Sequence, residues 1–299
     1  MLTIKHIKKK HKKIQALQDV SLQMEIGKCY GLIGPNGAGK SSLLKILASI
    51  NQPDDGKVLI NNESLSKKHK GLIGYIPQEL SLEETVSAYQ NLLFFGKLYG
   101  LKGKQLKSSI YQVLQLIGLT ERAKEKVFTF SGGMKRRLNI GCALLHQPSI
   151  LIMDEPTVGI DPQSRQFIFQ LIHELKQQHT LIIYASHYME EIEEICDEAV
   201  FIDHGNIIKS ATIQELANAY ASPSVFIKGD TCLPDHASLI GRVTNKHGGY
   251  IITTNHPLST MESIIQHCHT NNILPEQLEL LKPRLEDTFF SLTGSQLRD

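Results

Sequence analysis

Short apolar runs followed by a glycine, amide, acid or histidine recur along the first two-thirds of the chain. Residues 29–33 lead into GPNGAGKS, GYIP at 74–77 into Gln78, ILIM at 150–153 into Asp154 and Glu155, and TLIIYAS at 180–186 into His187. Runs of this length are typical of strands that are buried on both faces of a parallel sheet. Because such strands end at one edge of the sheet, we expect the residues after them to gather there.

Helical spacing of apolar residues follows or separates these runs. Leu43, Leu44, Ile46 and Leu47 give a helix a buried face directly after GPNGAGKS. A second helix is predicted by apolar positions that share one face, and Gly118 is typical of its C-terminal stop. These positions are Leu106, Ile110, Val113, Leu114 and Ile117. After FSGG, an apolar residue at every fourth position (Met134, Leu138 and Cys142) predicts a third helix.

The segment GPNGAGKS at 34–41 matches the phosphate-binding pattern G-x-x-x-x-G-K-S. Backbone N–H groups of small residues close around the phosphates, Lys40 neutralises the terminal phosphates, and the Ser41 hydroxyl suits Mg²⁺. A glycine turn between a strand and a helix is the alternative, but the Lys-Ser pair and the strand–loop–helix context favour a nucleotide site. We therefore expect nucleotide contacts from Gly34, Pro35, Asn36, Gly37, Ala38, Gly39, Lys40, Ser41 and Ser42.

Two acids at the end of the run 150–155 predict the groups that act on the metal and on water. Asp154 supports Mg²⁺, and Glu155 takes a proton from water. A strand that ends in a solvated acidic loop is the alternative, which is disfavoured because Pro156 turns the chain at once. A GTPase is disfavoured too, since NKHG at 245–248, the nearest match to N-K-x-D, lacks the acid.

Three further elements are consistent with a phosphate site. His187 occupies the same topological position as Glu155, which favours a γ-phosphate contact over an ordinary structural hydrogen bond. Gln78 would ligate Mg²⁺ or position water, although on its own it resembles a loop residue. The segment 131–133, Ser-Gly-Gly, begins a predicted helix, and backbone amides at a helix start suit an anion.

Composition changes this picture little. The chain has 299 residues, of which 41% are hydrophobic and 21% charged, and its net charge is +2. These values describe a globular protein without a global field for nucleic acid, so we expect no nucleic-acid partner. The lysine run at 8–13 is interpreted as a solvated loop, and Lys135, Arg136 and Arg137 as the solvated side of their helix.

Three absences predict a cytoplasmic location. The start, MLTIKHIKKKHKK, lacks the apolar core of a secretory signal. No run of about 18 apolar residues, the length of a membrane span, is present. The five cysteines are scattered, odd in number and without C-x-x-C spacing, which favours reduced thiols.

Taken together, these motifs resemble the ATP-binding-cassette family. The resemblance rests on GPNGAGKS at 34–41, Gln78, SGGMKRR at 131–137, ILIMDEPT at 150–157, GIDP at 159–162 and His187, whose order and spacing match over residues 1–220. It implies an α/β P-loop NTPase fold with a mostly parallel core sheet, an antiparallel β part at the N-terminus, and an inserted helical subdomain at about 79–147. It also implies ATP and Mg²⁺ as cofactors, and ATP hydrolysis coupled to transmembrane transport.

The resemblance identifies the Ser-Gly-Gly turn as the family's signature loop. It implies that Ser131, Gly132 and Gly133 close on ATP held by the P-loop of a second ATPase subunit. Phe130 and Met134 stand where a leucine and a glutamine are more usual. Because Met134 cannot make the hydrogen bonds of an amide, it is given no polar role.

Other implied roles concern the interface, the adenine and the partners. Asp161 would lie at the same subunit interface, and His11 falls where the family has an adenine-stacking aromatic, with an exposed loop residue as the alternative. A separate transmembrane permease is implied, and part of the aromatic-rich segment 85–101 would receive it, although an ordinary subdomain core accounts for most of these side chains. A homodimer and a heterodimer of ATPase subunits both stay open. The protein is expected to be peripheral at the inner face of the cell membrane.

An appendage follows the cassette. The hairpin-like AVFIDHGNIIKSA and the helix-like TIQELANAY precede a break at Ser222-Pro223, so we expect an ATP-binding domain over 1–221 and a small α+β domain over 222–299. Strands at 224–229 and 250–255 and a helix around 258–268 suggest a βαβ-like order in this domain.

Two features of the appendage bear on function. Its ending LEDTFFSLTG, together with SGGMKRR, resembles the ATPases of bacterial exporters, including drug- and antibiotic-export systems. His267-Cys268-His269 disfavours a zinc site, since adjacent helical residues point in different directions.

The main hypothesis is the ATPase subunit of a membrane transporter, an exporter. A non-transport switch that acts on ribosomes or DNA keeps the same ATPase core, but one cassette per chain and no sustained heptads favour transport. A regulatory module that binds ATP without turnover would lack Glu155 or His187, and both are present. Cargo contacts are expected in the membrane subunits, so the sequence does not name the cargo.

Overall fold

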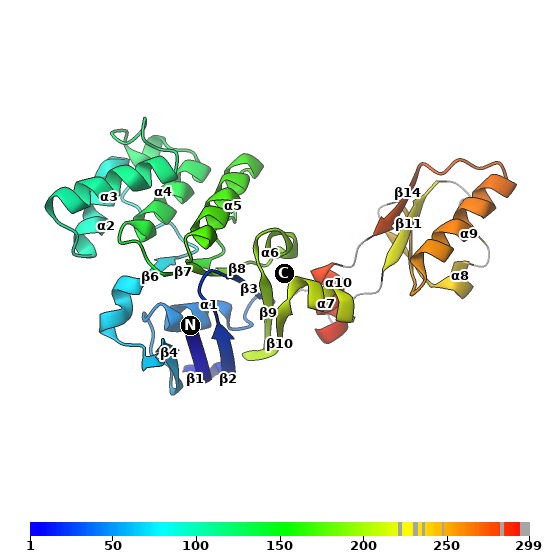
Figure 1. Ribbon diagram of the computed structural model, residues 1–299, viewed down its shortest axis with the longest axis horizontal. Helices are drawn as coiled ribbons and strands as arrows, with labels where there is room; N and C mark the ends of the chain where they lie inside the picture. The colour runs from blue at the N-terminus through cyan, green and yellow to red at the C-terminus, as the bar shows by residue number, and fades with distance from the viewer. Residues whose placement is uncertain (221–222, 230–232, 235–236, 247, 282–283, 294–299) are drawn as a thin grey trace. The chain divides into compact units, whose positions relative to one another are not determined.

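The computed structural model describes residues 1–220, 223–229, 233–234, 237–246, 248–281 and 284–293. The chain divides into two compact units, Met1–Thr212 and Ile213–Gln296 (Figure 1). Within the described residues, every helix is too short or too polar to traverse a lipid bilayer. The boundary expected at 221 and 222, Cys232, and His247 of the NKHG segment lie outside the described residues.

A mostly parallel sheet of six strands forms the core of the first unit. Its order is β10-β9-β3-β8-β7-β6, and only β10 at the edge runs antiparallel to its neighbour. The strands are β3 (Cys29–Ile33), β6 (Ile73–Ile76), β7 (Ile150–Asp154), β8 (Leu181–Ala185), β9 (Glu198–Asp203) and β10 (Asn206–Thr212). Every residue of β3, β7 and β8 is buried, as expected for strands covered on both faces.

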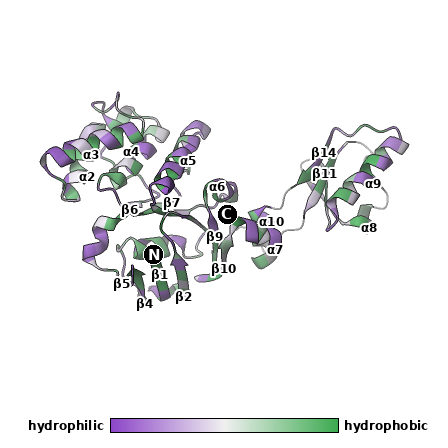
Figure 2. Ribbon diagram, in the orientation of Figure 1, coloured by the Kyte–Doolittle hydropathy of each residue, from purple (hydrophilic) through white to green (hydrophobic). Residues whose placement is uncertain are grey.

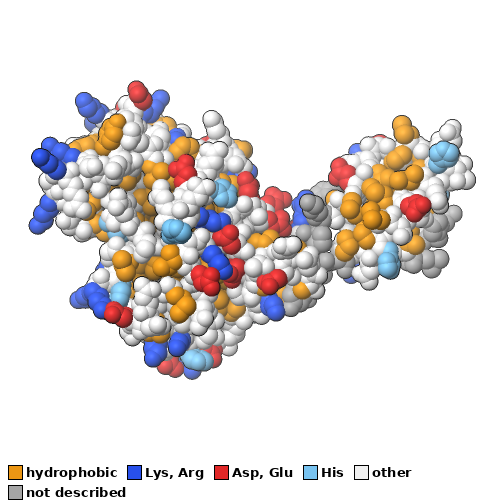
Figure 3. All heavy atoms as spheres, in the orientation of Figure 1, with side chains coloured by type: hydrophobic (Ala, Val, Ile, Leu, Met, Phe, Trp, Pro, Cys, Tyr) orange, Lys and Arg blue, Asp and Glu red, His pale blue; other side chains and the backbone are white. Residues whose placement is uncertain are grey.

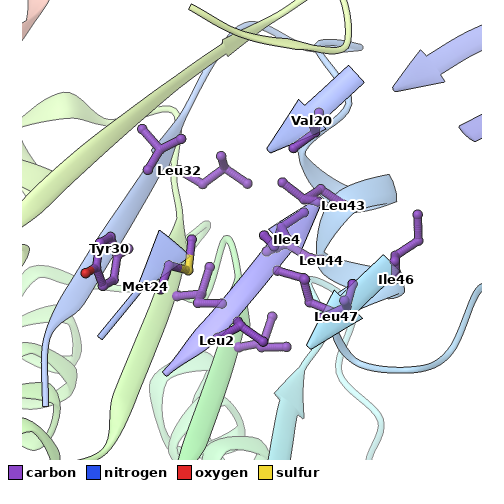
Figure 4. Close-up of a cluster of buried hydrophobic side chains, with 14 of the residues drawn as sticks. Leu2, Ile4, Val20, Met24, Tyr30, Leu32, Leu43, Leu44, Ile46 and Leu47 are labelled. Carbon is purple, nitrogen blue, oxygen red and sulfur yellow. The ribbon is translucent and has the colours of Figure 1, made fainter. Parts of the chain in front are cut away.

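An antiparallel sheet at the N-terminus packs with the core sheet around one helix. This sheet has the order β2-β1-β4-β5. Its strands are β1 (Leu2–His11), β2 (Ile14–Met24), β4 (Asp55–Ile60) and β5 (Glu63–Ser64), and the helix is α1 (Lys40–Leu47). Leu43, Leu44, Ile46 and Leu47 of α1 join one buried cluster with residues of both sheets (Figure 4). The lysine run at 8–13 is therefore the end of β1 and its hairpin turn, not an irregular loop.

A helical subdomain is inserted between β6 and β7. It contains α2 (Ala88–Leu98), α3 (Gly103–Leu116), α4 (Gly132–Leu144) and the short 3₁₀ turn η2 (Val127–Thr129), while η1 (Lys67–Leu72) precedes β6. The apolar face predicted over 106–117 is buried, and Gly118 ends the helix with φ +64°, so this prediction is confirmed. Hydrophobic and hydrophilic turns alternate along these helices (Figure 2). On the core sheet, α5 (Pro162–Gln177) contacts β8 and α6 (Met189–Ile195) contacts β3.

The second unit contains an antiparallel sheet of four strands in the order β12-β13-β11-β14. Its elements are α7 (Ile213–Tyr220), β11 (Ser224–Lys228), α8 (Ala237–Ile240), β12 (Arg242–Lys246), β13 (Gly249–Thr253), α9 (Pro257–Thr270), β14 (Gln277–Leu281) and α10 (Leu285–Thr293). The predicted strands and helix are present, and Ile264 and Cys268 of α9 pack on β11 in a small core. The βαβ-like order was wrong, because each pair of neighbouring strands is antiparallel.

The two units separate earlier than the expected boundary. They divide after Thr212, so α7 groups with the second unit. The reason is a contact with the end of the chain: α7 packs against α10, and the buried Thr288 hydroxyl donates to the Leu216 carbonyl oxygen at 3.3 Å. Sequence spacing alone did not reveal this pairing of helices about 70 residues apart.

Candidate nucleotide site

The candidate site lies at the carboxyl edge of the core sheet. The register pairs Ala185, the last residue of β8, with Leu32 of β3 and with Asp154 of β7, and it pairs Ile76 of β6 with Met153. The strands therefore end almost level, and the loops that follow them leave from one edge. This register brings together the P-loop, Gln78, the two acids and His187.

The P-loop is held in shape by glycines. Gly37 and Gly39 have φ values of +80° and +111°, which other residues adopt at a cost. A Cβ at Gly34 would overlap the carbonyl oxygen of Ile202 in β9, so this position also needs glycine. Backbone amides of a glycine-rich loop before a helix are groups that would bind a phosphate chain.

Lys40 is buried within the same loop. Its ammonium group donates to the carbonyl oxygens of Gly34 at 2.6 Å and Pro35 at 3.2 Å. Burial lowers the pKa of Lys40, while the charges of Glu155 and Asp154 oppose that shift.

Oxygen donors for a hard cation meet beside the loop. The Ser41 hydroxyl donates to Asp154 Oδ1 at 3.3 Å, and the Tyr75 hydroxyl lies 3.5 Å from Asp154 Oδ2. Burial raises the pKa of Asp154 above its ordinary value, although the Ser41 hydrogen bond opposes the shift. A buried carboxylate with hydroxyl neighbours fits a divalent cation, which would supply the positive charge that it lacks.

Glu155 is held in an unusual backbone conformation beside this pair. Its φ is +49°, a region that a residue other than glycine occupies at a cost, and its N–H donates to the Ala185 carbonyl oxygen at 3.0 Å. Its carboxylate meets two other site residues: Gln78 Nε2 at 3.4 Å and His187 Nδ1 at 3.3 Å, both at Oε2. Of the three predicted catalytic residues, Glu155 thus contacts both Gln78 and His187.

His11 lies next to the helix that follows the P-loop. It is the last residue of β1, and its Nε2 is 3.2 Å from the Ser42 hydroxyl oxygen. The ring is exposed, so its face is accessible to a planar ligand.

The signature turn caps one helix and packs against another. The Ser131 hydroxyl accepts a hydrogen bond from the Met134 N–H at 3.3 Å at the start of α4. Gly133 faces the start of α5, where a Cβ would overlap the Ser164 hydroxyl and lie 3.1 Å from Asp161 Oδ2. Asp161 caps α5 by accepting from the Ser164 N–H at 2.8 Å, which lowers its pKa. Ser131 and Gly132 remain exposed.

The basic residues after the turn were assigned wrongly to a solvated face. Arg136 is only 5% exposed, and its guanidinium donates to the carbonyl oxygens of Pro77 at 3.1 Å and Gln78 at 2.8 Å. Arg137 donates to the Ile117 carbonyl oxygen at 3.1 Å and stacks over the Phe167 ring. The signature helix is therefore bonded directly to the loop that carries Gln78.

Sequence reasoning missed Arg136 and Tyr75 at this site. Tyr75 could have been found, since it lies in the strand before Gln78 and alternates with Ile76 across the sheet. Arg136 gave no usable signal, because an arginine beside other basic residues is usually solvated.

Comparison with known proteins identifies the family of the chain. Residues 17–158 match the family described as ABC transporter. The linearmycin resistance ATP-binding protein LnrL of Bacillus subtilis (strain 168) is 38% identical over 100% of both chains. The doxorubicin resistance ATP-binding protein DrrA of Mycobacterium tuberculosis (strain ATCC 25618 / H37Rv) is 37% identical over 68% of this chain and 62% of its own. The Nod factor export ATP-binding protein I of Ralstonia nicotianae (strain ATCC BAA-1114 / GMI1000) is 29% identical over 100% and 95%.

Solved structures share the cassette fold. One described as the ATP binding subunit of an ABC transporter superposes with a TM-score of 0.66 at 27% identity, over 73% of this chain and 92% of its own. The dimeric cassette MJ0796 bound to ADP and Pi gives a TM-score of 0.64 at 23% identity, over 71% and 98%, a likeness of fold.

The chain belongs to the ABC transporter family. It is an ATP-binding subunit of the exporter type, and it hydrolyses ATP to drive transport, which confirms the main hypothesis from the sequence.

Replacing Asp154 by asparagine separates function from stability. Because its pKa is raised on folding, the carboxyl group favours the folded state below its unfolded-state pKa, and this contribution is lost as pH rises through the folded-state pKa. We therefore expect Asp154→Asn to have a higher Tm than the unmodified protein at pH 7, a difference that disappears below about pH 4, and to lose Mg²⁺-dependent hydrolysis. Calorimetry across pH measures the first effect, and phosphate release the second.

Glu121→Gln is the matched control for that experiment, because Glu121 is an exposed carboxylate. A gain in Tm that persists unchanged at low pH, or one that the control also shows, would contradict the assignment of the effect to the buried charge.

Replacing Arg136 by methionine should loosen the Gln78 loop. The carbonyl oxygens of Pro77 and Gln78 lose the charged donor that the buried guanidinium supplies, so we expect the free energy of unfolding to fall by about 1–3 kcal/mol and ATPase activity to fall with it. Lys135→Met is the control, since Lys135, whose side chain is 18% exposed, makes an ion pair with the half-exposed Glu84 and, within the described residues, no hydrogen bond to the Gln78 loop. Urea unfolding and steady-state hydrolysis measure both; equal losses in the two variants would remove the special role of Arg136.

Proposed function

We propose that two copies of this cassette, bound to a separate permease at the cytoplasmic face of a membrane, export an antibiotic- or drug-like compound. The single observation that carries this proposal is the contact set of Glu155, which joins Gln78 and His187 at one carboxylate oxygen. In this proposal residues 1–212 are the ATP-binding domain, and the unit after Thr212 is an accessory domain.

Each site residue has a defined task in the proposed reaction. Glu155 takes a proton from the attacking water, and Gln78 and His187 orient its carboxylate. His187 also contacts the γ-phosphate of ATP. Lys40 leaves the carbonyl oxygens of its own loop to neutralise the terminal phosphates, while the P-loop amides hold them. His11 stacks on the adenine from its place beside Ser42.

We also assign a Mg²⁺ site to this edge. Ser41, Asp154 and Gln78 would hold the ion, and the buried Asp154 carboxylate beside the Ser41 hydroxyl is the support for this assignment. When bound, Mg²⁺ supplies positive charge to the β- and γ-phosphate oxygens. Tyr75 keeps the second oxygen of Asp154 in place from the side of β6.

The signature turn acts on the partner's nucleotide in this proposal. Gly132 and Gly133 are the first residues of α4, and the first N–H groups of a helix have no acceptor within it. Ser131 and Gly132 are exposed, so the amides and the helix dipole meet whatever binds there. Asp161 borders the same surface, because its carboxylate lies next to Gly133.

An apolar ridge on the helical subdomain is the candidate surface for the permease. Phe94 and Leu98 stand one turn apart on α2 and are 63% and 70% exposed. Side chains of this kind are visible on the helical part of the molecule, beside lysine and arginine side chains (Figure 3). Other aromatic residues of the segment 85–101 are less exposed: Tyr89 and Phe95 are half-buried, and the Tyr99 ring, 36% exposed, stacks on His146. Exposed apolar side chains that adjoin each other favour a partner over solvent.

Capture of the Glu155→Gln protein tests the dimer and the permease together. Loss of the base should leave ATP and Mg²⁺ binding intact but slow turnover at least about 100-fold, so the ATP-bound dimer accumulates. We expect tagged Glu155→Gln protein, isolated from gently solubilised cells with ATP and Mg²⁺, to carry a polytopic membrane protein in stoichiometric amount.

Phe94→Asp combined with Leu98→Asp, in the same Glu155→Gln background, provides the matched control. These changes should remove the membrane protein while the ATP-dependent dimer persists by light scattering. Ribosomal or DNA-bound proteins in place of a membrane protein would contradict the transport proposal and favour the alternative switch.

The cargo is tested in cells. Two relatives are named for linearmycin and doxorubicin resistance, so we expect deletion of the coding sequence to lower the inhibitory concentration of at least one such compound. The unmodified chain should restore resistance, and Glu155→Gln should not. Unchanged sensitivity to a broad panel of antibiotics and drugs would move the cargo to another chemical class.

A further inference from the structure

A buried carboxylate behind the site, Glu191, collects three hydroxyl groups at one oxygen. Its Oε2 accepts hydrogen bonds from Thr157 at 2.8 Å, Tyr184 at 2.9 Å and Ser186 at 2.8 Å. Glu191 lies in the first turn of α6 and is only 3% exposed. Neither the motifs nor the site described above uses it.

Two of the three donors come from the loops that carry the reacting groups. Thr157 is two residues after Glu155, and Ser186 directly precedes His187. Tyr184 is in β8, between these loops and the core. Glu191 is thus the shared acceptor of the loop of the proposed base and the loop of the proposed γ-phosphate contact.

The number of hydroxyl protons limits how these groups can be hydrogen-bonded. Each hydroxyl has a single proton and lies within hydrogen-bond distance of Glu191 Oε2, while the Thr157 and Tyr184 hydroxyl oxygens are also 3.1 Å from each other. Burial, reinforced by the charge of Glu191, raises the pKa of Tyr184 well above its ordinary value, so its hydroxyl stays protonated and able to donate. The Ser186 oxygen then accepts from the Tyr188 N–H at 3.0 Å, so one serine holds the chain on both sides of His187.

The other oxygen of Glu191 is on the side of α5, the helix that Asp161 caps. It lies 3.9 Å from an Arg165 guanidinium nitrogen, and it accepts no hydrogen bond within the described residues. Burying a carboxylate that has one oxygen without a hydrogen bond costs free energy of folding. This cost indicates that Glu191 is present for a reason other than stability alone.

We propose that Glu191 is a positioning residue for ATP hydrolysis: by holding Thr157 and Ser186 together, it sets the contact between Glu155 and His187. This inference rests on the roles proposed for those two residues. The 3.3 Å contact between His187 Nδ1 and Glu155 Oε2 depends on where two separate loops stop, and Glu191 is the group that bonds to both. A displacement of either loop moves the base relative to the phosphate.

Glu191→Gln in the full-length chain tests the proposal. A glutamine offers one carbonyl oxygen in place of a carboxylate, and its amide group donates where the hydroxyl groups need an acceptor. We expect kcat, normalised to the nucleotide-binding sites present, to fall at least about tenfold while the Kd for ATP with Mg²⁺ changes less than about threefold. Glu194→Gln is the matched control on the same helix, since Glu194 is exposed and accepts only a surface bond from Gln166.

A double-mutant cycle separates positioning from a loss of folding. Thr157→Val removes one of the three hydroxyl donors at nearly constant volume. If both residues act through one contact, Thr157→Val should lower kcat by itself and add little in the presence of Glu191→Gln. Independent, additive effects on kcat would overturn the proposal, as would a Glu191→Gln protein whose normalised kcat is within about twofold of the unmodified value.

Glu155→Gln, measured in the same assay, keeps the two proposals distinct. If Glu155→Gln turns over normally, the role of the base is wrong. If Glu155→Gln is inactive and Glu191→Gln is normal, only the positioning role is wrong. A drop in Tm with normalised kcat unchanged would identify Glu191 as structural and overturn the inference.

Discussion

The site depends on the register of four parallel strands. β3, β8, β7 and β6 end almost level, so that a phosphate loop, a histidine, two acids and a glutamine emerge side by side. A slip of one residue would turn every side chain of the slipped strand to the opposite face of the sheet. Because both faces of these strands are buried and apolar, only the size and shape of the side chains oppose such a slip. The turn chemistry therefore matters: Gly34 must approach β9 closely, and Glu155 must take up a left-handed conformation as soon as β7 ends. Level strand ends bring the site residues together only because the chain changes direction directly after each strand.

The charges at this edge are arranged for a ligand and not for the empty protein. Lys40 is buried against its own loop, and Asp154 is buried beside two hydroxyl groups, with the pKa of the lysine lowered and that of the acid raised. Both pKa shifts have the same main cause, because burial removes the charged groups from water and their protein neighbours compensate only in part. In the proposed site, a nucleotide triphosphate with a divalent cation would supply the missing charges of both signs. The folded protein thus carries a cost that ligand binding offsets, a common property of active sites.

The sequence predicted the parts of the fold that follow from local pattern. Buried strands, the P-loop and the buried face of α3 each show within a dozen residues, and the motif spacing identified the family. What it missed was long-range and polar. Arg136 lies two residues from the apolar position Met134, hence on another face of α4, and only the arrival of the Gln78 loop makes that face buried. The grouping of α7 with α10, and the shared acceptor at Glu191, likewise depend on contacts between distant segments. The spacing of residues along one helix or strand does not show which residue of another element they contact.

The cassette is internally connected in a way that makes a two-copy mechanism physically reasonable. Arg136 bonds the signature helix to the Gln78 loop, Gly133 touches Asp161 and Ser164 at the start of α5, and Glu191 faces Arg165 of that helix while holding Thr157 and Ser186. An anion that a partner copy brings to the exposed end of α4 would therefore press on the same elements that align Glu155 and His187. The same few short, buried contacts would therefore link binding at the exposed end of α4 to hydrolysis at the nucleotide site. Close packing leaves such contacts few alternative arrangements. Coupling of this kind would need no large rearrangement, since a shift of either loop by less than the length of a hydrogen bond would change whether the proposed base, Glu155, reaches an attacking water.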